Sequence, residues 1–153
     1  MRVIITYGTF DLFHVGHARL LQRLKAMGDK LVVGLSSDDF NLKKGKKSFF
    51  SYEERKEILL STKYVDEVFM ESRWEQKIND IVSYKADIFA IGDDWKGKFD
   101  FLSEYCDVVY LERTDNISTT QIKSGLEKIT DKDIEQLESK IHEIFEIIKV
   151  IKS

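Results

Sequence analysis

The fold is decided by one stretch near the N-terminus, Tyr7-Gly8-Thr9-Phe10-Asp11-Leu12-Phe13-His14-Val15-Gly16-His17. An apolar run over residues 3–6 precedes it and predicts a buried strand. Leucines at helical spacing follow it and predict a first helix over about residues 17–27. We therefore interpret the stretch as the turn between a first strand and a first helix. In an open α/β sheet such a turn lies at the carboxyl ends of the strands, where these folds bind ligands.

The residue types in this turn suit a nucleotide phosphate. Gly8 allows a tight turn after the strand, and Gly16 allows the backbone to approach a ligand closely. Thr9 offers a hydroxyl group. The free N–H groups and the positive dipole end of the following helix attract an anion. The sequence therefore predicts a phosphate-binding turn.

Two histidines in this turn, His14 and His17, are three residues apart and share one face of the predicted helix. Their imidazoles can donate hydrogen bonds to phosphate oxygens that gain charge as the phosphorus becomes five-coordinate. Half of a metal site and plain surface residues are the alternatives. Zinc needs further ligands, and besides carboxylates the chain offers only Cys106 and His142. We therefore favour catalysis and expect no metal held by protein side chains.

The composition limits the classes of function. With 153 residues and no proline, the chain has the length of one domain. Its 24 basic and 27 acidic residues give a net charge of -3, which provides no general attraction to nucleic acid or to an anionic membrane. The single cysteine excludes an internal disulfide and suits a reducing compartment. No apolar stretch has the length of a signal segment or membrane span, so we expect a cytoplasmic protein.

Further apolar runs predict four more strands, over residues 31–35, 64–69, 87–91 and 108–111. Helical patterns separate them, over residues 51–61, from 74 with Ile78, Ile81 and Val82 as its buried face, over 99–105, and from about 120. Strands that alternate with helices indicate an α/β fold, a single Rossmann-like domain with a five-stranded parallel sheet covered on both faces. We place this domain at residues 1–127.

The tail, residues 128–153, predicts a long amphipathic helix. Its apolar residues recur at helical spacing among glutamates and lysines, at Ile134, Leu137, Ile141, Ile144, Phe145, Ile148 and Ile151. Such a face packs on its own domain or pairs with a second copy. Because homodimers are the commonest oligomers, we expect a homodimer.

Three other basic features lie near predicted strand ends. Four lysines surround Gly45 in residues 41–50, and this segment is either a solvated loop or a flexible loop that closes over phosphates. Arg55 lies one turn into the next helix, where pairing with an acidic residue and binding substrate phosphate are equally good interpretations. Arg113 directly follows the fifth strand, where its guanidinium can bind phosphate oxygens in a bidentate manner.

The motifs together resemble a known family. Gly8 to His17 is similar to the signature of the HxGH nucleotidyltransferase superfamily, and Arg113-Thr114-Asp115-Asn116-Ile117-Ser118-Thr119-Thr120 resembles the second signature of its cytidylyltransferase branch. Gly92-Asp93-Asp94-Trp95 and Lys44-Gly45-Lys46 add to the likeness, which runs from Met1 to about Leu126. The resemblance implies the strand order 3-2-1-4-5. The chain departs from the branch at Lys63, where arginine is frequent, and at Asn116, where glycine is usual.

The resemblance also implies a reaction. CTP would be attacked in line at its α-phosphorus by sn-glycerol 3-phosphate, giving CDP-glycerol and pyrophosphate, with Mg²⁺ carried mainly by the CTP phosphates. The product would supply teichoic acid or a related cell-surface polymer. Choline, ethanolamine or sugar phosphate as acceptor, ATP in place of CTP, and a non-catalytic nucleotide sensor are the alternatives. A choline pocket would need an aromatic cage, for which the candidates are Trp74, Trp95 and Tyr105.

The resemblance assigns residues to each task. Catalytic roles fall on His14, His17, Lys46 and Arg113. The nucleotide would contact Gly8, Thr9, Phe10, His14, Val15, Gly16, His17, Lys46, Asp94, Arg113, Thr114, Ile117, Ser118, Thr119 and Thr120. The acceptor would contact Asp11, Lys44, Lys77, Trp74 and Arg55.

Overall fold

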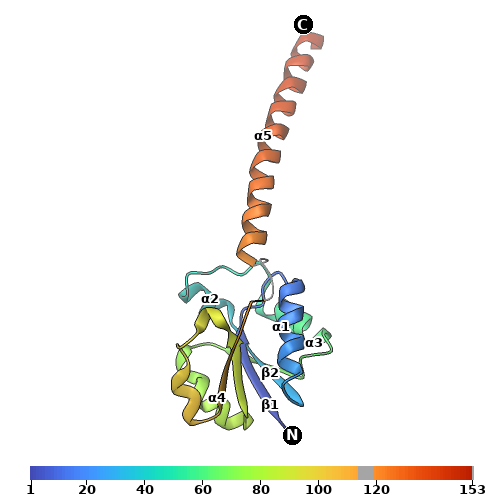
Figure 1. Ribbon diagram of the computed structural model, residues 1–153. Coiled ribbons are helices and arrows are strands. Elements are labelled where there is room, and N and C mark those ends of the chain that lie inside the picture. Colours follow the sequence, from blue (N-terminus) through green and yellow to red (C-terminus); the bar gives the residue numbers. More distant parts are fainter. Residues whose placement is uncertain (114–118, 153) are drawn as a thin grey trace. The chain divides into compact units, whose positions relative to one another are not determined.

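The computed structural model describes residues 1–113 and 119–152, without the side chains of residues 126–130. It falls into two compact units, Met1–Asn116 and Ile117–Ser153. The first unit is built on a parallel sheet of five strands in the order β3-β2-β1-β4-β5, which confirms the predicted α/β fold and strand order (Figure 1). Its strands are β1 (Val3–Gly8), β2 (Lys30–Ser36), β3 (Glu67–Glu71), β4 (Ile88–Gly92) and β5 (Asp107–Leu111).

Helices cover both faces of this sheet. Helices α1 (Val15–Lys25) and α3 (Tyr52–Ser61) pack on one face, where Leu21, Leu24 and Leu59 join the strand residues of one core cluster. Helix α4 (Lys77–Tyr84) and the 3-10 helix η3 (Asp100–Glu104) pack on the other, where Ile81 and Leu102 join a second cluster. Figure 1 shows α1 and α3 on one side of the strands and α4 on the other. Burial on both faces explains the nearly continuous apolar strands.

Four details of the predicted elements were wrong. Strand β3 spans Glu67–Glu71 instead of 64–69, and Asp66 before it accepts a hydrogen bond from the Leu31 amide. Helix α1 begins at Val15, two residues earlier than expected, because the side chain of His14 caps it. A short helix, α2 (Asp38–Lys43), was missed at the start of the lysine-rich segment, where the hydroxyl of Ser37 accepts a hydrogen bond from the Phe40 amide. Val82 is exposed, since α4 turns only Ile81 fully into the core.

The turn after β1 gets its shape from residues other than glycine. Phe10 and Leu12 have positive φ angles of 50° and 48°, whereas Gly8 simply ends β1. A Cβ added to Gly8 would lie 2.8 Å from the Phe10 ring, so Gly8 makes room for that ring. Gly8 thus allows the tight turn by leaving space for this ring and not by an unusual φ angle. Two strained non-glycine residues in one turn are typical of functional sites.

The second unit holds helix α5 (Thr119–Lys152), which runs without a break for 34 residues. It therefore continues across position 127, where the sequence analysis placed a domain boundary, and that boundary stays a prediction. Within the described parts of the chain, no helix is both long enough and apolar enough to cross a lipid bilayer.

Candidate active site

The carboxyl ends of all five strands lie at one edge of the sheet, because every strand pair is parallel. This edge therefore holds the loops after β1, β2, β3 and β4, in which most of the predicted site residues lie. Between β1 and β4 the strand order reverses, and ligands of open α/β sheets bind at such a point. The site is built on these loops.

The two histidines form a reciprocal cap at the start of α1. The Gly16 amide donates to Nδ1 of His14 at 3.0 Å, and the His14 amide donates to Nδ1 of His17 at 3.2 Å. Their rings stack with centroids 3.9 Å apart. Because each Nδ1 accepts a backbone hydrogen bond, the ring proton of each neutral imidazole is assigned to Nε2. Each ring thus keeps an Nε2–H donor for a ligand.

Burial keeps both imidazoles neutral. His17 is packed between the rings of Phe10 and Phe13, at centroid distances of 5.4 and 5.5 Å. This burial, with the neighbouring His14 as a second cause and opposed by Asp11, lowers the pKa of His17 to about 4. Burial also lowers the pKa of His14. Both rings are therefore neutral hydrogen-bond donors at neutral pH.

This lowered pKa predicts a pH dependence of stability. Between about pH 6.5 and about pH 4 the imidazole of His17 takes up a proton in the unfolded chain and stays neutral in the folded one. The contribution of His17 to the free energy of unfolding should therefore be fully present above about pH 6.5 and decrease as the pH is lowered through this window. His17→Gln removes this titration and keeps an acceptor for the His14 amide. Urea midpoints at about pH 7.5 and about pH 5 should differ less in this variant, and an equal difference would contradict the assignment.

Asp11 and Arg55 connect the loops around the site. The Asp11 carboxylate is buried and accepts hydrogen bonds from the amides of Phe49 and Phe50 at 2.6 and 3.0 Å. Asp11 therefore ties the turn after β1 to the end of the lysine-rich segment. The fully buried Arg55 guanidinium donates to the carbonyls of Thr9, Ser36 and Phe50 and to Asp38. Of its two interpretations, the structure places it with an acidic partner.

Asn41 is a further positioning residue, one that the sequence analysis missed. Its side chain is fully buried, accepts from the Thr9 hydroxyl at 3.0 Å and donates to the Ser48 hydroxyl at 2.7 Å. Because the Thr9 hydroxyl donates its hydrogen bond to Asn41, its oxygen can only accept a hydrogen bond from a ligand. No local pattern identifies Asn41, because Thr9 lies 32 residues away in the chain.

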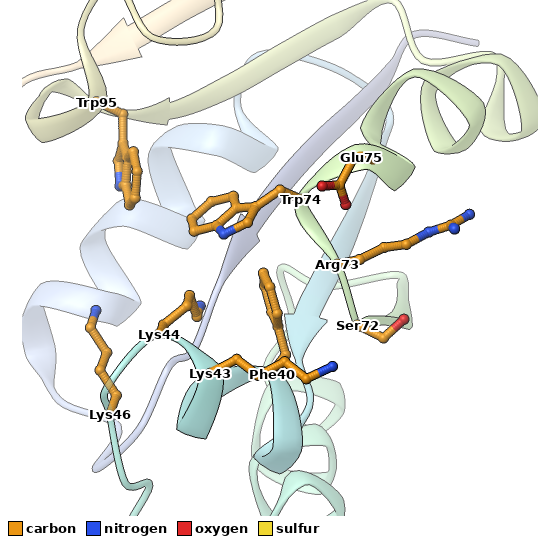
Figure 2. A pocket seen from close by; sticks show the side chains of 9 residues that line it. All are labelled: Phe40, Lys43, Lys44, Lys46, Ser72, Arg73, Trp74, Glu75 and Trp95. Carbon is orange, nitrogen blue, oxygen red and sulfur yellow. The ribbon is translucent and has the colours of Figure 1, made fainter.

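A pocket of about 610 Å³ opens beside the lysine-rich segment. Its lining comes from α2 and the residues after it, from the loop after β3, and from the loop after β4: Phe40, Lys43, Lys44, Lys46, Ser72, Arg73, Trp74, Glu75 and Trp95. Figure 2 shows Trp74 between Phe40 and Trp95 with Lys44 and Lys46 beside them, whereas Arg73 points away. Trp74 and Trp95 converge, with centroids 5.5 Å apart, and Tyr105 is not in the lining.

A buried ionic network lies next to this pocket. Nζ of Lys77 is 2.6 Å from Glu71, and both side chains are almost fully buried. Glu71 also accepts from the Ser36 hydroxyl, which in turn accepts from Nζ of Lys44 at 3.0 Å. Burial lowers the pKa of Lys44, and the charge of Glu71 opposes that effect. Glu71 and Ser36 were not singled out from the sequence, although together they fix two predicted acceptor lysines.

The loops after β4 and β5 contribute an exposed ion pair. Arg113 contacts Asp94 at 3.2 Å, and both side chains are more than half exposed. Such a pair contributes little to stability, so Arg113 can exchange its carboxylate for a phosphate at low cost. Among the residues that the structure describes, no cluster of three or more His, Cys, Asp or Glu side chains could hold a metal ion.

The structure thus gathers most of the predicted residues at one sheet edge. Of the second signature, Thr114, Ile117 and Ser118 lie outside the described residues, as does Asn116. Thr119 and Thr120 open α5 in the second unit. Lys63 lies with Nζ 5.5 Å from the Tyr64 ring, and the effect of its replacing an arginine stays a prediction.

Comparisons with known proteins identify the family. The cytidylyltransferase-like family model matches residues 5–125. The chain is 64% identical over 126 residues to the glycerol-3-phosphate cytidylyltransferase of Bacillus spizizenii, covering 82% of this chain and 98% of that protein. It is 52% identical to the enzyme of the same name from Staphylococcus aureus, over 82% of this chain and 96% of that one. A lipopolysaccharide core biosynthesis protein from Thermoplasma volcanium has a similar crystal structure, with a TM-score of 0.68, 25% identity, and coverage of 75% and 99%.

Proposed function

The chain belongs to the cytidylyltransferase-like family, and from that membership we propose that it transfers a cytidylyl group from CTP to sn-glycerol 3-phosphate. The products are CDP-glycerol and pyrophosphate. The observation that carries the proposal is the high identity to glycerol-3-phosphate cytidylyltransferases over 82% of the chain. The proposal includes a cytoplasmic enzyme that supplies CDP-glycerol for teichoic acid or a related polymer.

The reaction is a direct in-line displacement. An oxygen of the acceptor phosphate forms a bond to the α-phosphorus of CTP while the bond from that phosphorus to the α,β-bridging oxygen breaks, and pyrophosphate leaves with the bonding pair. The acceptor oxygen is already anionic near neutral pH, so no general base is needed. The Nε2–H groups of His14 and His17 donate to the α-phosphate oxygens as they gain charge. Neutral donors are suitable because they need not lose or gain a proton during the step.

The triphosphate lies on the other side of the reacting phosphorus. Lys46 is exposed in the pocket lining, and Arg113 lies in an exposed ion pair, so both can reorient toward phosphate oxygens. By family likeness, Ser118 and Thr119 complete this side. CTP enters as its magnesium complex, in which the ion neutralises charge on the phosphates.

The acceptor binds in the pocket beside Lys44 and Trp74. The aromatic faces there are already covered by ammonium groups of the chain itself. Nζ of Lys77 lies 4.7 Å from the Trp74 ring centroid, and Nζ of Lys44 lies 4.5 Å from that of Phe40. A choline or ethanolamine headgroup would bring a further positive charge against these lysines. A phosphate that carries an uncharged polyol avoids this repulsion, and this supports glycerol 3-phosphate.

Pyrophosphate release with magnesium tests the proposal. CTP and ATP are each combined with glycerol 3-phosphate, choline phosphate, ethanolamine phosphate and a sugar phosphate. We expect release only from CTP with glycerol 3-phosphate. Release with a different pair would keep the mechanism and replace the substrate. No release in any combination, with CTP still bound, would identify a nucleotide sensor instead.

A further inference from the structure

The apolar face of α5 has the heptad spacing of a coiled coil. Six branched residues follow one another at alternating intervals of three and four, at Ile134, Leu137, Ile141, Ile144, Ile148 and Ile151. All six are exposed, from 39% for Ile148 to 77% for Ile151. A mean interval of 3.5 residues keeps these side chains in one stripe when two helices supercoil around each other. We call this stripe the seam.

A partner for the seam must itself be a long helix. The seam spans 134–151, about 27 Å at 1.5 Å per residue. Among the described helices of the first unit, none is longer than the 11 residues of α1. Their buried apolar residues already pack against the sheet. Only α5 itself has the matching length and spacing, and the seam lies beyond residues 5–125, which the family model matches.

A lipid surface fits the helix less well. Residues 131–152 contain six acidic residues and four lysines, a net charge of -2. Helices that lie on membranes are typically rich in lysine and arginine on their polar face, because cellular membranes present anionic lipids. The charge of α5 therefore favours a protein partner.

We propose that the seam pairs in antiparallel orientation with the seam of a second copy of this chain. Residues 131–138 carry four acidic side chains and one lysine, a net charge of -3, whereas 149–152 carry two lysines. An antiparallel pair places the acidic start of each helix beside the basic end of the other and opposes the two helix dipoles. Ile134 then faces Ile151 of the second copy, and Leu137 faces Ile148. A parallel pair would bring Asp133 beside Glu138, two like charges.

Sedimentation equilibrium of the full chain tests the pairing. The double variant Ile141→Asp, Ile144→Asp places charges at the centre of the seam. Val150→Asp is the matched control, because Val150 is a branched, exposed residue of the same helix outside the seam. We expect the wild type and the control to have twice the mass of the double variant, whose self-association should be at least about 100-fold weaker.

Other occupants of the seam give other results, and each would overturn the proposal. Equal masses for all three proteins, with a lower melting temperature for the double variant alone, would mean that the seam packs within its own chain. Equal masses with seam-dependent sedimentation on vesicles of anionic lipid would mean that it binds membranes. Equal loss of association in the double variant and the control would mean that no defined seam exists.

Disulfide trapping tests the orientation. In a Cys106→Ser background, Leu137→Cys and Ile148→Cys are prepared as separate full-length chains and oxidised alone or mixed. In the antiparallel pair, two copies of residue 137 are about 16 Å apart along the axis, so neither variant alone should cross-link. The mixture should form a covalent dimer. Efficient cross-linking of Leu137→Cys alone would show a parallel pair and overturn the proposed orientation.

Discussion

His14→Asn and His17→Gln should each lower the turnover number by at least about 100-fold while the fold survives. Each substitution removes one Nε2–H donor from the proposed transition state of cytidylyl transfer. Asparagine is a good N-cap residue, and glutamine at the third helical position completes a capping box, so both variants keep the acceptor that stabilises α1. The measurement is pyrophosphate release at saturating CTP and glycerol 3-phosphate.

Alanine variants at the same positions separate catalysis from helix capping. His14→Ala removes the cap as well as the donor, which should cost about 1 kcal/mol of stability beyond the loss of activity. Urea unfolding of His14→Ala and His14→Asn should show this difference, whereas their turnover numbers should be similarly low. Near-normal turnover in His14→Asn or His17→Gln would remove that imidazole from the mechanism.

Lys77→Met should lower the free energy of unfolding by about 3–5 kcal/mol. Methionine is similar in length to lysine, but it leaves Glu71 buried without its ionic partner, from which Nζ of Lys77 is 2.6 Å away. The double variant Lys77→Met, Glu71→Gln removes both charges and should recover most of the lost stability. Urea unfolding of the wild type, the two single variants and the double variant gives the coupling energy between these residues.

A matched exposed pair provides the control for this prediction. Lys30 contacts Glu67 at 2.9 Å, and their side chains are 32% and 42% exposed. Lys30→Met should therefore cost less than about 1 kcal/mol, because water already solvates that pair. If Lys77→Met cost no more than Lys30→Met, the buried pair would not be an essential part of the floor of the site.

The elements were predictable where one local pattern decides them. Continuous apolar runs predicted the central strands β1, β2 and β4, since a strand covered on both faces has no polar side to display. The serine and glutamate of a capping box located the start of α3 at Ser51 and Glu54. Helix α2 was missed because it is only six residues long, and the serine cap before it was not recognised as a helix start.

The roles of individual polar residues were predictable only in part. Asp11, Arg55 and Lys77 were expected at the acceptor, and the structure shows how their charged groups are held by partners within the fold. A direct contact between any of them and substrate stays a prediction. Asn41 and Glu71 carried no motif, and their importance follows entirely from what they touch.

The sequence by itself determined the class of fold, the position of the turn between β1 and α1 and the family, because each depends on patterns of residues that are close together in the chain. Only the tertiary structure decided which nitrogen of each imidazole accepts a backbone hydrogen bond, that Glu71 pairs with Lys77, and which aromatic rings are already covered by ammonium groups. Ser36 meets Glu71 across 35 residues of sequence, through the register of β2 with β3. Such register is fixed when the two faces of the sheet are buried together, so no local pattern contains it.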